Sequence, residues 1–361
     1  MITSDSFTKQ WIEGIRKKQK TGKINPPVFE KMIFAFALLE KLAENGLDFI
    51  FKGGTSLVLL LSDFRRFSTD IDIITQQTEE ELRAVLEKIV QSSVFTAYKK
   101  DEKRSSNQPI PKSHYNISFP SNYNQEGTIT LDVIFDTHPY PEIIEKEIRT
   151  AWFETEKPFI KVKLPNVDSI LGDKLTAFAP HTTGIPYFRN ETSMSIEIIK
   201  QLFDIGTLID HVKNPETVFK SFVNSVNKQQ AYFNLNLNIN HVFDDIFNTS
   251  LIIAKRERNV TEQDKTYFSY LKDGIRGFNQ YLSEGNFRIE EAVSTAGKVA
   301  FFTSLMRTEK FEKFGLYPTT DLPDQPEIVN TNYNFLNRLK KTNREAFYYW
   351  CHALELLNLS E

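Results

Sequence analysis

The stretch from Lys52 to Thr75 decides how this chain is interpreted, and it reads KGGTSLVLLLSDFRRFSTDIDIIT. The apolar run Leu47–Phe51 before it predicts a buried strand, Leu57–Leu61 predicts a short helix, and Asp70–Ile74 predicts a second strand. The Gly53-Gly54 pair therefore stands between a strand and the start of a helix, where the backbone can approach a ligand and free N–H groups favour an anion such as phosphate. A plain tight turn needs the same pair, so the glycines alone leave both interpretations open.

Two carboxylates follow the glycines at a spacing that places them together. Asp70 and Asp72 are at positions i and i+2 of the predicted strand, so their side chains lie on the same face. Their mutual repulsion would be relieved by a divalent cation, although a solvated acidic face on an edge strand explains the pair equally well. Asp132 is isolated among apolar residues of a later predicted strand, and it needs a cation or hydrogen-bond donors there. A strand-end aspartate bonded to backbone amides is the simpler explanation of Asp132 alone, but the ordered set is more specific than any member.

The rest of the chain predicts an α+β fold with two domains. Helical spacing runs from Val28 to Ala43, Thr78 followed by Glu81 predicts a capping box, and residues 99–113 are predicted as a mobile loop. Two further strands are predicted at Tyr115–Phe119 and Thr128–Phe135. Beyond Pro165 the periodicity is helical, which predicts one domain over residues 1–165 and a mostly α-helical one over 166–361.

Composition sets outer limits on the function. The 361 residues carry 44 Lys and Arg against 47 Asp and Glu, a formal net charge of −3, and this near-neutral charge argues at first against a nucleic-acid partner. A single cysteine, Cys351, excludes an internal disulfide and a zinc site built on several cysteines, and it fits a reducing cytoplasm. No segment approaches the roughly 18 uninterrupted apolar residues that a membrane span needs, and the first residues lack an apolar signal-peptide core.

The ordered set of a glycine loop, two carboxylates on one strand and a third on another resembles the nucleotidyltransferase superfamily related to DNA polymerase β. Within that superfamily, the run from Lys52 to Asp72 is similar to the AbiEii/AbiGii toxin family, which acts in abortive phage infection and type IV toxin–antitoxin systems. The family's downstream motif is matched by two segments, Ser169–Leu175, which carries Lys174, and Lys200–Ile205, which carries Asp204. Gln201 stands where many members have an acidic residue. The resemblance covers about residues 30–210 and implies a polymerase-β-like domain, a mixed sheet flanked by helices, followed by a helical domain that contributes Lys174 and Asp204 to the cleft.

The resemblance also implies roles for individual residues. Asp70, Asp72 and Asp132 would hold Mg²⁺ or Mn²⁺, and Asp132 would accept the proton of the acceptor hydroxyl. Lys174 would steady the triphosphate of an NTP, with Asp204 as its alternative partner in a structural salt bridge. The remaining nucleotide-binding residues implied by the resemblance are Lys52, Gly53, Gly54, Thr55, Ser56, Arg66 and Ser68.

The partners implied are an NTP, an RNA acceptor such as the 3′ end of tRNA, and a separately encoded antitoxin that neutralises the toxin in the cytoplasm. Support for RNA comes from local charge, because basic residues gather in four patches: Arg16–Lys23, Lys99–Arg104 with Lys112, Lys255 with Arg256 and Arg258, and Arg338 with Lys340, Lys341 and Arg344. A protein or small-molecule acceptor is an alternative. A nucleotide-binding module without chemistry is another, although the full carboxylate set argues against it.

Overall fold

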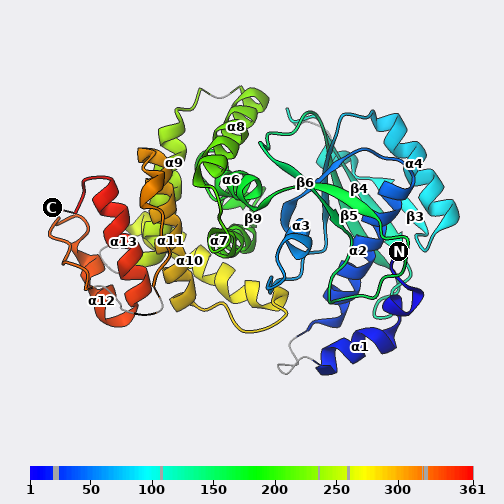
Figure 1. Cartoon of the computed structure of the whole chain (residues 1–361), viewed down its shortest axis with the longest axis horizontal. Coiled ribbons are helices and arrows are strands. Elements are labelled where there is room, and N and C mark those ends of the chain that lie inside the picture. Colours follow the sequence, from blue (N-terminus) through cyan, green and yellow to red (C-terminus); the bar gives the residue numbers. More distant parts are fainter. Residues whose placement is uncertain are drawn as a thin grey trace. The chain divides into compact units, whose positions relative to one another are not determined.

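The chain forms two compact units (Figure 1). The computed structural model describes residues 1–18, 24–105, 109–234, 236–257, 261–318, 320 and 324–360. The first unit, called the sheet unit below, comprises Met1–Asn166 and Gln280–Asn286. The second, called the helical unit, comprises Val167–Asn279 and Phe287–Glu361.

A seven-stranded mixed sheet organises the sheet unit, in the order β3-β4-β5-β2-β1-β7-β6. β2 pairs with β5 and β1 with β7 in parallel, and the other neighbours are antiparallel. This confirms the predicted α+β class with a mixed sheet. The strands are β1 (Ile50–Lys52), β2 (Ile71–Thr75), β3 (Ala97–Lys100), β4 (Lys112–Phe119), β5 (Gly127–Phe135), β6 (Ile143–Glu147) and β7 (Lys161–Pro165).

One face of the sheet is closed by helices α2 (Pro26–Glu44) and α4 (Glu79–Ser92). Phe34 of α2 stacks on Phe119 of β4 with the ring centroids 4.0 Å apart, and Phe36 meets Phe51 of β1 edge to face. Tyr115, on the same strand face as Phe119, donates a hydrogen bond to a carboxylate of α4. Alternation along β4 and its neighbours therefore sends one set of side chains into this core and the other set to the opposite face.

Short elements at the edges of this core set the position of the glycine loop and of α4. Helix α3 (Gly53–Leu60) starts directly at the end of β1, so the glycine pair forms its first turn. The predicted capping box of α4 is confirmed by both of its hydrogen bonds, Thr78 with the Glu81 backbone and Glu81 with the Thr78 backbone. The remaining helices of the unit are α1 (Lys9–Lys18) and α5 (Glu102–Ser105).

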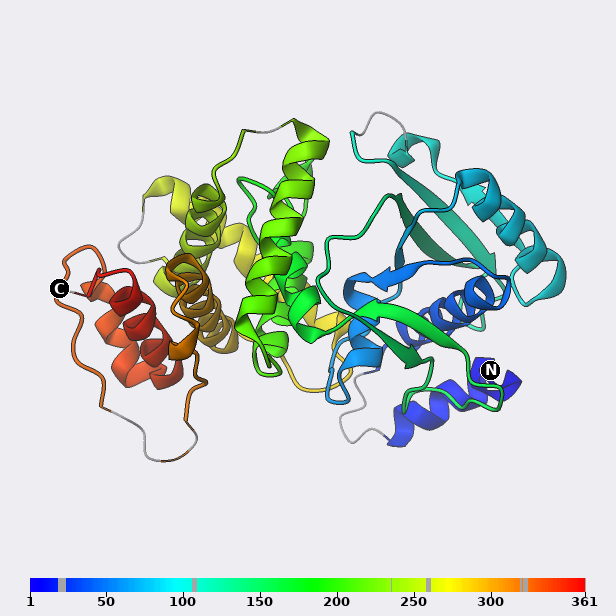
Figure 2. The ribbon, with the colours of Figure 1, turned by 45° about the horizontal axis from the view of Figure 1, so that its top comes forward.

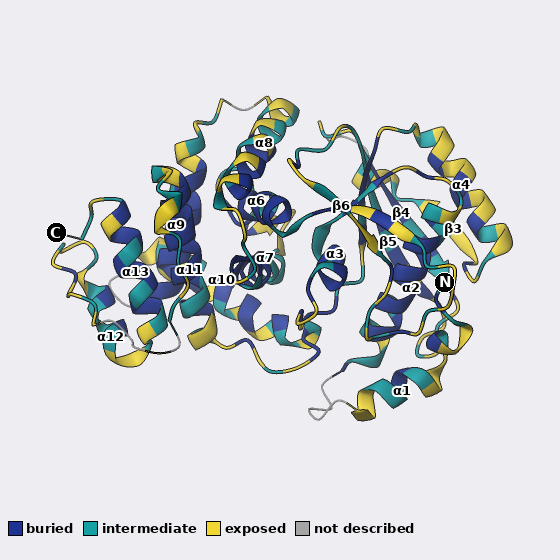
Figure 3. Cartoon of the chain, in the orientation of Figure 1, coloured by how far each residue is buried: buried dark blue, intermediate teal, exposed yellow. Residues whose placement is uncertain are grey.

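Beyond residue 167 the ribbon is almost wholly helix and connecting loop (Figure 2). Helix α11 is buried along most of its length, and α7, α9 and α13 pack against it (Figure 3). Among the described residues no helix is long and apolar enough to cross a membrane. The helices are α6 (Val167–Ala177), α7 (Ser195–Ile209), α8 (Pro215–Phe233), α9 (Ile239–Lys255), α10 (Glu262–Phe278), α11 (Ile289–Thr308), α12 (Leu339–Thr342) and α13 (Arg344–Leu356), with a small hairpin of β8 (Phe188–Arg189) and β9 (Thr192–Ser193).

The prediction of a mobile loop over residues 99–113 was wrong. Strand β3 ends at Lys100, α5 follows, and β4 already begins at Lys112. Strand β3 has exposed and partly exposed residues in alternation and carries two lysines, so its sequence lacks the apolar alternation that marks a half-buried strand. Tertiary pairing with β4 forms the strand, and residues 106–108 lie outside the described part of the chain.

Candidate active site

Four polar side chains form a row across the sheet on the face opposite α2 and α4. Asp72 of β2 is the register partner of Asp132 on β5 and of Lys52 on β1, and Asp132 is the register partner of His114 on β4. Residues in register on neighbouring strands share a face and are separated by about 4.8 Å between strands. Asp72 and Asp132 are therefore brought together as a pair of carboxylates from two parallel strands.

The first glycine of the loop lies directly against this pair. Gly53 has φ +76°, and a Cβ built on it would lie 2.1 Å from Oδ2 of Asp72. An alanine in this position would thus collide with the carboxylate and also require a strained backbone. A tight turn alone would explain the positive φ of Gly53. The close approach of the Asp72 carboxylate is a second reason why this position needs a glycine.

The second glycine is enclosed by a buried arginine. A Cβ on Gly54 would lie 2.4 Å from Nη2 of Arg66 and 3.0 Å from Oγ of Ser68. Arg66 is only 4% exposed, and its guanidinium donates to the Phe67 carbonyl at 3.2 Å. The backbone at the start of α3 is thus flanked by a guanidinium on one side and by a carboxylate on the other.

The two hydroxyl residues after the glycines donate to backbone carbonyls, one within the turn and one next to β2. Thr55 donates to the Asp70 carbonyl at 2.5 Å and Ser56 to the Gly53 carbonyl at 2.8 Å, and both are buried. The Thr55 bond ties the start of α3 to the residue preceding β2. In this structure the hydroxyls hold the loop in shape, and the backbone amides of the first turn remain the groups suited to an anion.

Asp132 is held by two different partners. One oxygen, Oδ1, lies 2.6 Å from Nδ1 of His114, whose side chain is buried, and the other, Oδ2, lies 3.3 Å from Nη2 of Arg104, which is exposed. His114 was not among the residues predicted from the sequence. The signal was present: His114, Asn116 and Ser118 alternate with the apolar positions of β4, which places His114 on the same face as Asp132.

Asp70 differs from the other two carboxylates. It precedes β2, is exposed, and lies 3.7 Å from the ammonium of Lys31 on α2. Across the described residues, three or more His, Cys, Asp or Glu side chains nowhere come together as a metal-binding group. The chemistry of the pair Asp72 and Asp132 still suits a hard cation, because Mg²⁺ is usually bound by one or two carboxylates together with substrate phosphates.

Lys174 and Asp204 meet inside the helical unit. Nζ of Lys174 on α6 lies 2.7 Å from Oδ2 of Asp204 on α7, and both side chains are almost fully buried. Gln201, the residue that departs from the family pattern, lies one helical turn before Asp204 and offers its Oε1 to the same ammonium at 3.2 Å. The ion pair that the sequence allowed as a structural alternative is therefore present in this structure.

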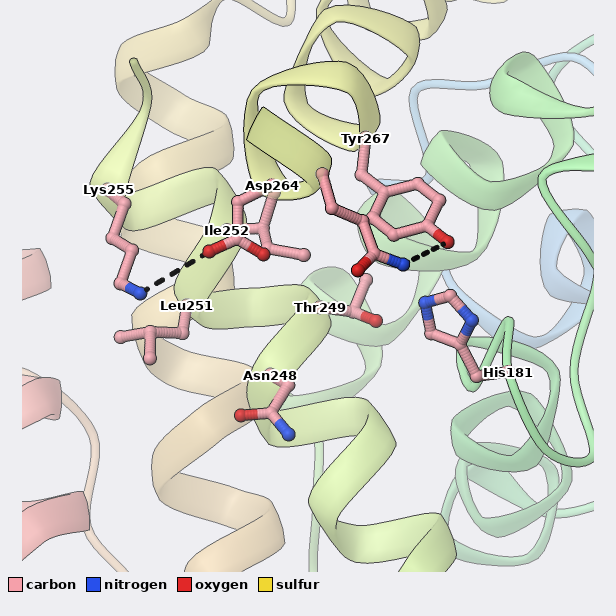
Figure 4. Close-up of a pocket in the computed structure, with 9 residues that line it drawn as sticks. His181, Asn248, Thr249, Leu251, Ile252, Lys255, Asp264 and Tyr267 are labelled. Atoms are coloured by element: carbon pink, nitrogen blue, oxygen red, sulfur yellow. Dashed lines mark hydrogen bonds and ion pairs between the residues drawn. The ribbon is translucent and has the colours of Figure 1, made fainter. Parts of the chain in front are cut away.

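A separate pocket of about 260 Å³ lies in the helical unit between α9, α10 and the start of the 181–187 loop (Figure 4). His181 and Tyr267 lie together at one end, with ring centroids 5.0 Å apart, and the ion pair of Lys255 with Asp264 lies at the other. The loop is anchored within this unit, because the buried Asp245 accepts hydrogen bonds from the His181 amide and the Thr182 hydroxyl, each at 2.8 Å. Burial raises the pKa of Asp245, and these two donors lower it by less.

The four basic patches differ in how far their cations are already paired and in how close they lie to the carboxylate row. Arg338 donates to the carbonyls of Ala254 and Lys255, and Lys340 pairs with Asp324, so these cations of the last patch are already used within the helical unit. Of the aromatic residues beside that patch, Phe347, Tyr349 and Trp350 are buried. The Lys99–Arg104 patch instead adjoins the carboxylate row, because its Arg104 contacts Asp132. Lys20, Lys23 and Arg258 lie outside the described residues.

Comparisons with known proteins supply the family. Residues 37–284 match the family described as nucleotidyl transferase AbiEii toxin, type IV toxin–antitoxin system. No curated protein sequence matches the chain. Among solved structures, the nucleotidyltransferase toxin MenT4 from Mycobacterium tuberculosis is 12% identical with a TM-score of 0.46, covering 83% of this chain and 99% of that one. JHP933 from Helicobacter pylori is 16% identical with a TM-score of 0.41, covering 79% and 92%.

Proposed function

The chain belongs to the AbiEii nucleotidyl transferase toxin family of type IV toxin–antitoxin systems, and on that premise we propose that its sheet unit transfers a nucleotide from an NTP to RNA, with the 3′ end of tRNA as the first candidate acceptor. Family membership implies the NTP and an antitoxin partner. The observation that carries the proposal is the register pairing of Asp72 with Asp132 beside a glycine whose missing side chain makes room for the Asp72 carboxylate.

The triphosphate would bind at the first turn of α3. The amides of Gly53 and Gly54 offer backbone donors at a helix N-terminus, and the Arg66 guanidinium lies beside Gly54. Lys52 adds a positive charge on the face that carries Asp72, while Ser68 lies next to the same turn. Thr55 and Ser56 would act by fixing the loop through their backbone hydrogen bonds.

Asp72 and Asp132 would hold the divalent metal, and Asp70, which precedes β2 and pairs with Lys31, would have to leave that lysine to join them. When bound, Mg²⁺ or Mn²⁺ would neutralise charge on the triphosphate and polarise the α-phosphate. Asp132 presents its Oδ2 on the side of the exposed Arg104, and that oxygen is the candidate to accept the proton of the attacking hydroxyl. The hydroxyl oxygen would then bond to the α-phosphorus as the bond to pyrophosphate breaks.

The roles of Lys174 and Asp204 follow from the family motif. We propose that Lys174 steadies the triphosphate and that Asp204 holds the Lys174 ammonium in place. An ammonium shared between Asp204 and Gln201 is fixed in direction, and a second anion can approach it only along the remaining N–H. Lys174→Ala should therefore weaken the apparent binding of NTP, whereas Gln201→Leu should have a smaller effect.

RNA is the favoured acceptor because the positive charge nearest to Asp132 is exposed. Lys99, Lys103 and Arg104 are exposed side chains of β3 and α5, and Arg104 reaches Asp132. A polyanion drawn to these groups would place its terminal hydroxyl next to the proposed proton acceptor. The net charge of −3 does not oppose this, since binding depends on the local potential.

The test is incubation of the purified chain with each labelled NTP, Mg²⁺ and total tRNA, followed by separation of labelled RNA, protein and small molecules. Asp72→Asn should lower transfer by about 1,000-fold, as expected when a group that stabilises the transition state is removed. Asp48→Asn is the matched control, because Asp48 is a highly exposed aspartate of the same unit that pairs with Lys163. Wild-type transfer by Asp72→Asn would refute the mechanism.

The acceptor is tested by charge reversal. Lys99→Glu/Lys103→Glu should weaken transfer to RNA and reduce its dependence on salt, because each lost phosphate contact lowers the number of counterions released. Lys265→Glu/Lys272→Glu on α10 alters net charge equally and should leave transfer unchanged. Label in protein or in a small molecule, with none in RNA, would overturn the RNA acceptor and leave the enzyme class standing.

A further inference from the structure

Asp132 has a buried partner, His114, on one oxygen and an exposed partner, Arg104, on the other. From this difference we propose that His114 is a positioning residue for nucleotide transfer. It fixes the Asp132 carboxylate through Oδ1 and leaves Oδ2 to face the reacting groups. This inference rests on the proposed function, since it assigns His114 to the reaction in which Asp132 accepts the proton.

His114 is itself firmly held. It lies within β4, its backbone N–H donates to the Ser105 hydroxyl at 3.0 Å, and its carbonyl accepts from the Asp101 amide at 2.8 Å. The residue is 3% exposed, so its ring has no access to alternative partners in solvent. A side chain anchored on a strand interior in this manner can define the direction of a neighbouring carboxylate within a narrow range.

The hydrogen bonding assigns one tautomer to the ring. Nε2 is buried and has no hydrogen-bond partner among the described residues. A proton on Nε2 would therefore be an unsatisfied buried donor, whereas a proton on Nδ1 is donated to Oδ1 of Asp132 at 2.6 Å.

Arg104 is a different kind of partner for the same carboxylate. Its side chain is 47% exposed, the contact with Oδ2 is 3.3 Å, and α5 is a single turn. An exposed ion pair of this kind is weak and can be replaced by another ligand of the carboxylate. The two partners therefore have different roles. His114 holds Asp132 in place, and Arg104 can leave Oδ2 when the acceptor hydroxyl binds.

The experiment compares three substitutions of His114. Asn carries its amide nitrogen at the same number of bonds from the backbone as Nδ1, Gln carries it one bond further out, and Leu offers no donor. His114→Leu should lower kcat by about 10- to 100-fold while the KM for NTP changes by less than threefold, as expected when a supporting partner of a catalytic carboxylate is lost. His114→Asn should restore kcat to within about fivefold of wild type, and His114→Gln should remain close to His114→Leu.

A purely structural role predicts another pattern: all three variants would lose thermal stability together, and kcat per folded molecule would not change. That pattern, or a His114→Leu enzyme with a wild-type kcat, would overturn the proposal. Histidine ¹⁵N NMR of the wild-type protein gives a readout without activity, since a proton on Nδ1 supports the proposal and a proton on Nε2 alone contradicts it. Absence of transfer by the wild type and by Asp48→Asn alike would instead refute the proposed function, so the two failures are distinguishable.

Discussion

Two ion pairs of the chain use the same chemistry in opposite surroundings. In the sheet unit, Arg104 and Asp132 are 47% and 26% exposed as side chains, whereas in the helical unit Lys174 and Asp204 are 7% and 0% exposed. Exposed pairs contribute little to stability, typically below about 1 kcal/mol, because water and salt screen them. A buried pair cannot lose one member without leaving a charge uncompensated, at a cost of about 3–5 kcal/mol.

This difference in exposure means that Asp132 can exchange Arg104 for another ligand, whereas Asp204 cannot exchange Lys174. Asp132 and Asp70 are bound by the partly exposed cations Arg104 and Lys31, which solvent, metal or RNA can displace. Asp204 has no such freedom, so the role proposed for it is to hold Lys174 at a defined position. The comparison therefore divides the predicted site residues into those that can contact substrate and those that act through a neighbour.

The largest expected effect is on folding of the helical unit. Asp204→Ala should lower its free energy of unfolding by about 3–5 kcal/mol, because the buried Lys174 ammonium loses its counter-charge. The measurement is urea unfolding followed by the fluorescence of Trp350 in a Trp11→Phe/Trp152→Phe background, which leaves Trp350 as the single tryptophan.

The control for this prediction is the double variant Lys174→Met/Asp204→Leu. Replacing a buried pair by apolar residues of similar volume is often neutral or stabilising, so the double variant should recover most of the lost stability while remaining deficient in transfer. A double variant as unstable as Asp204→Ala would contradict the assignment of the pair as the cause.

A second test concerns activity without a large loss of stability. Gly53→Ala places a methyl group where the Asp72 carboxylate now lies, and a displacement near 1 Å of a catalytic group can cost about 100-fold in rate. Gly46→Ala is the matched control: it has a similar φ of +82° but no atom within 4 Å of the added Cβ. Both variants should lose about 1 kcal/mol of stability from backbone strain, and only Gly53→Ala should lose transfer activity.

Equal activity of the two glycine variants would show that the close approach of Asp72 has no role in the reaction. The glycine loop would then be explained as a tight turn, which is the alternative that the sequence left open.

The sequence predicted the central elements of the fold because their patterns are local. The capping box at Thr78 and the helix around Ile33 follow from spacing alone, and β2 and β5 follow from apolar runs. Strands β6 and β7 were not predicted, because half of their residues are exposed or polar and β7 pairs with β1 across more than a hundred residues. The return of residues 280–286 to the sheet unit, where Leu282 bridges to Arg66, carries no sequence signal at all.

The sequence predicts which residues of the candidate site share a face of one strand, but it does not predict which strands lie side by side. Spacing predicts Asp70 and Asp72 on one strand face, but in the structure Asp70 precedes β2 and pairs with Lys31 of α2. The register that sets Asp72 opposite Asp132 arises from a parallel pairing between distant segments. The partners of Asp132 could not be derived for the same reason, since His114 and Arg104 reach it from β4 and α5.

The smallest expected effect concerns a partly exposed ion pair of the sheet unit, Glu79 with Lys100, which stands in contrast to the buried pair of Lys174 and Asp204. Burial raises the pKa of Glu79, and the Lys100 ammonium at 2.6 Å and the Tyr115 hydroxyl at 2.5 Å lower it by more, so that it lies below the ordinary value of 4.5. A lowered carboxylate pKa contributes stability above the unfolded-state pKa, and that contribution is lost as pH falls through the folded-state pKa. Glu79→Gln should therefore cost about 0.5 kcal/mol at pH 7 and less at pH 3.5.

The measurement is the difference in unfolding free energy between wild type and Glu79→Gln from pH 7 to pH 3.5. The difference should also shrink in 1 M salt, because the Lys100 pair is about one third exposed and therefore screened. A cost of several kcal/mol, independent of pH and salt, would show that this pair behaves like Lys174 and Asp204. Side-chain exposure would then not separate exchangeable from fixed ion pairs, and the release of Asp132 by Arg104 would lose its support.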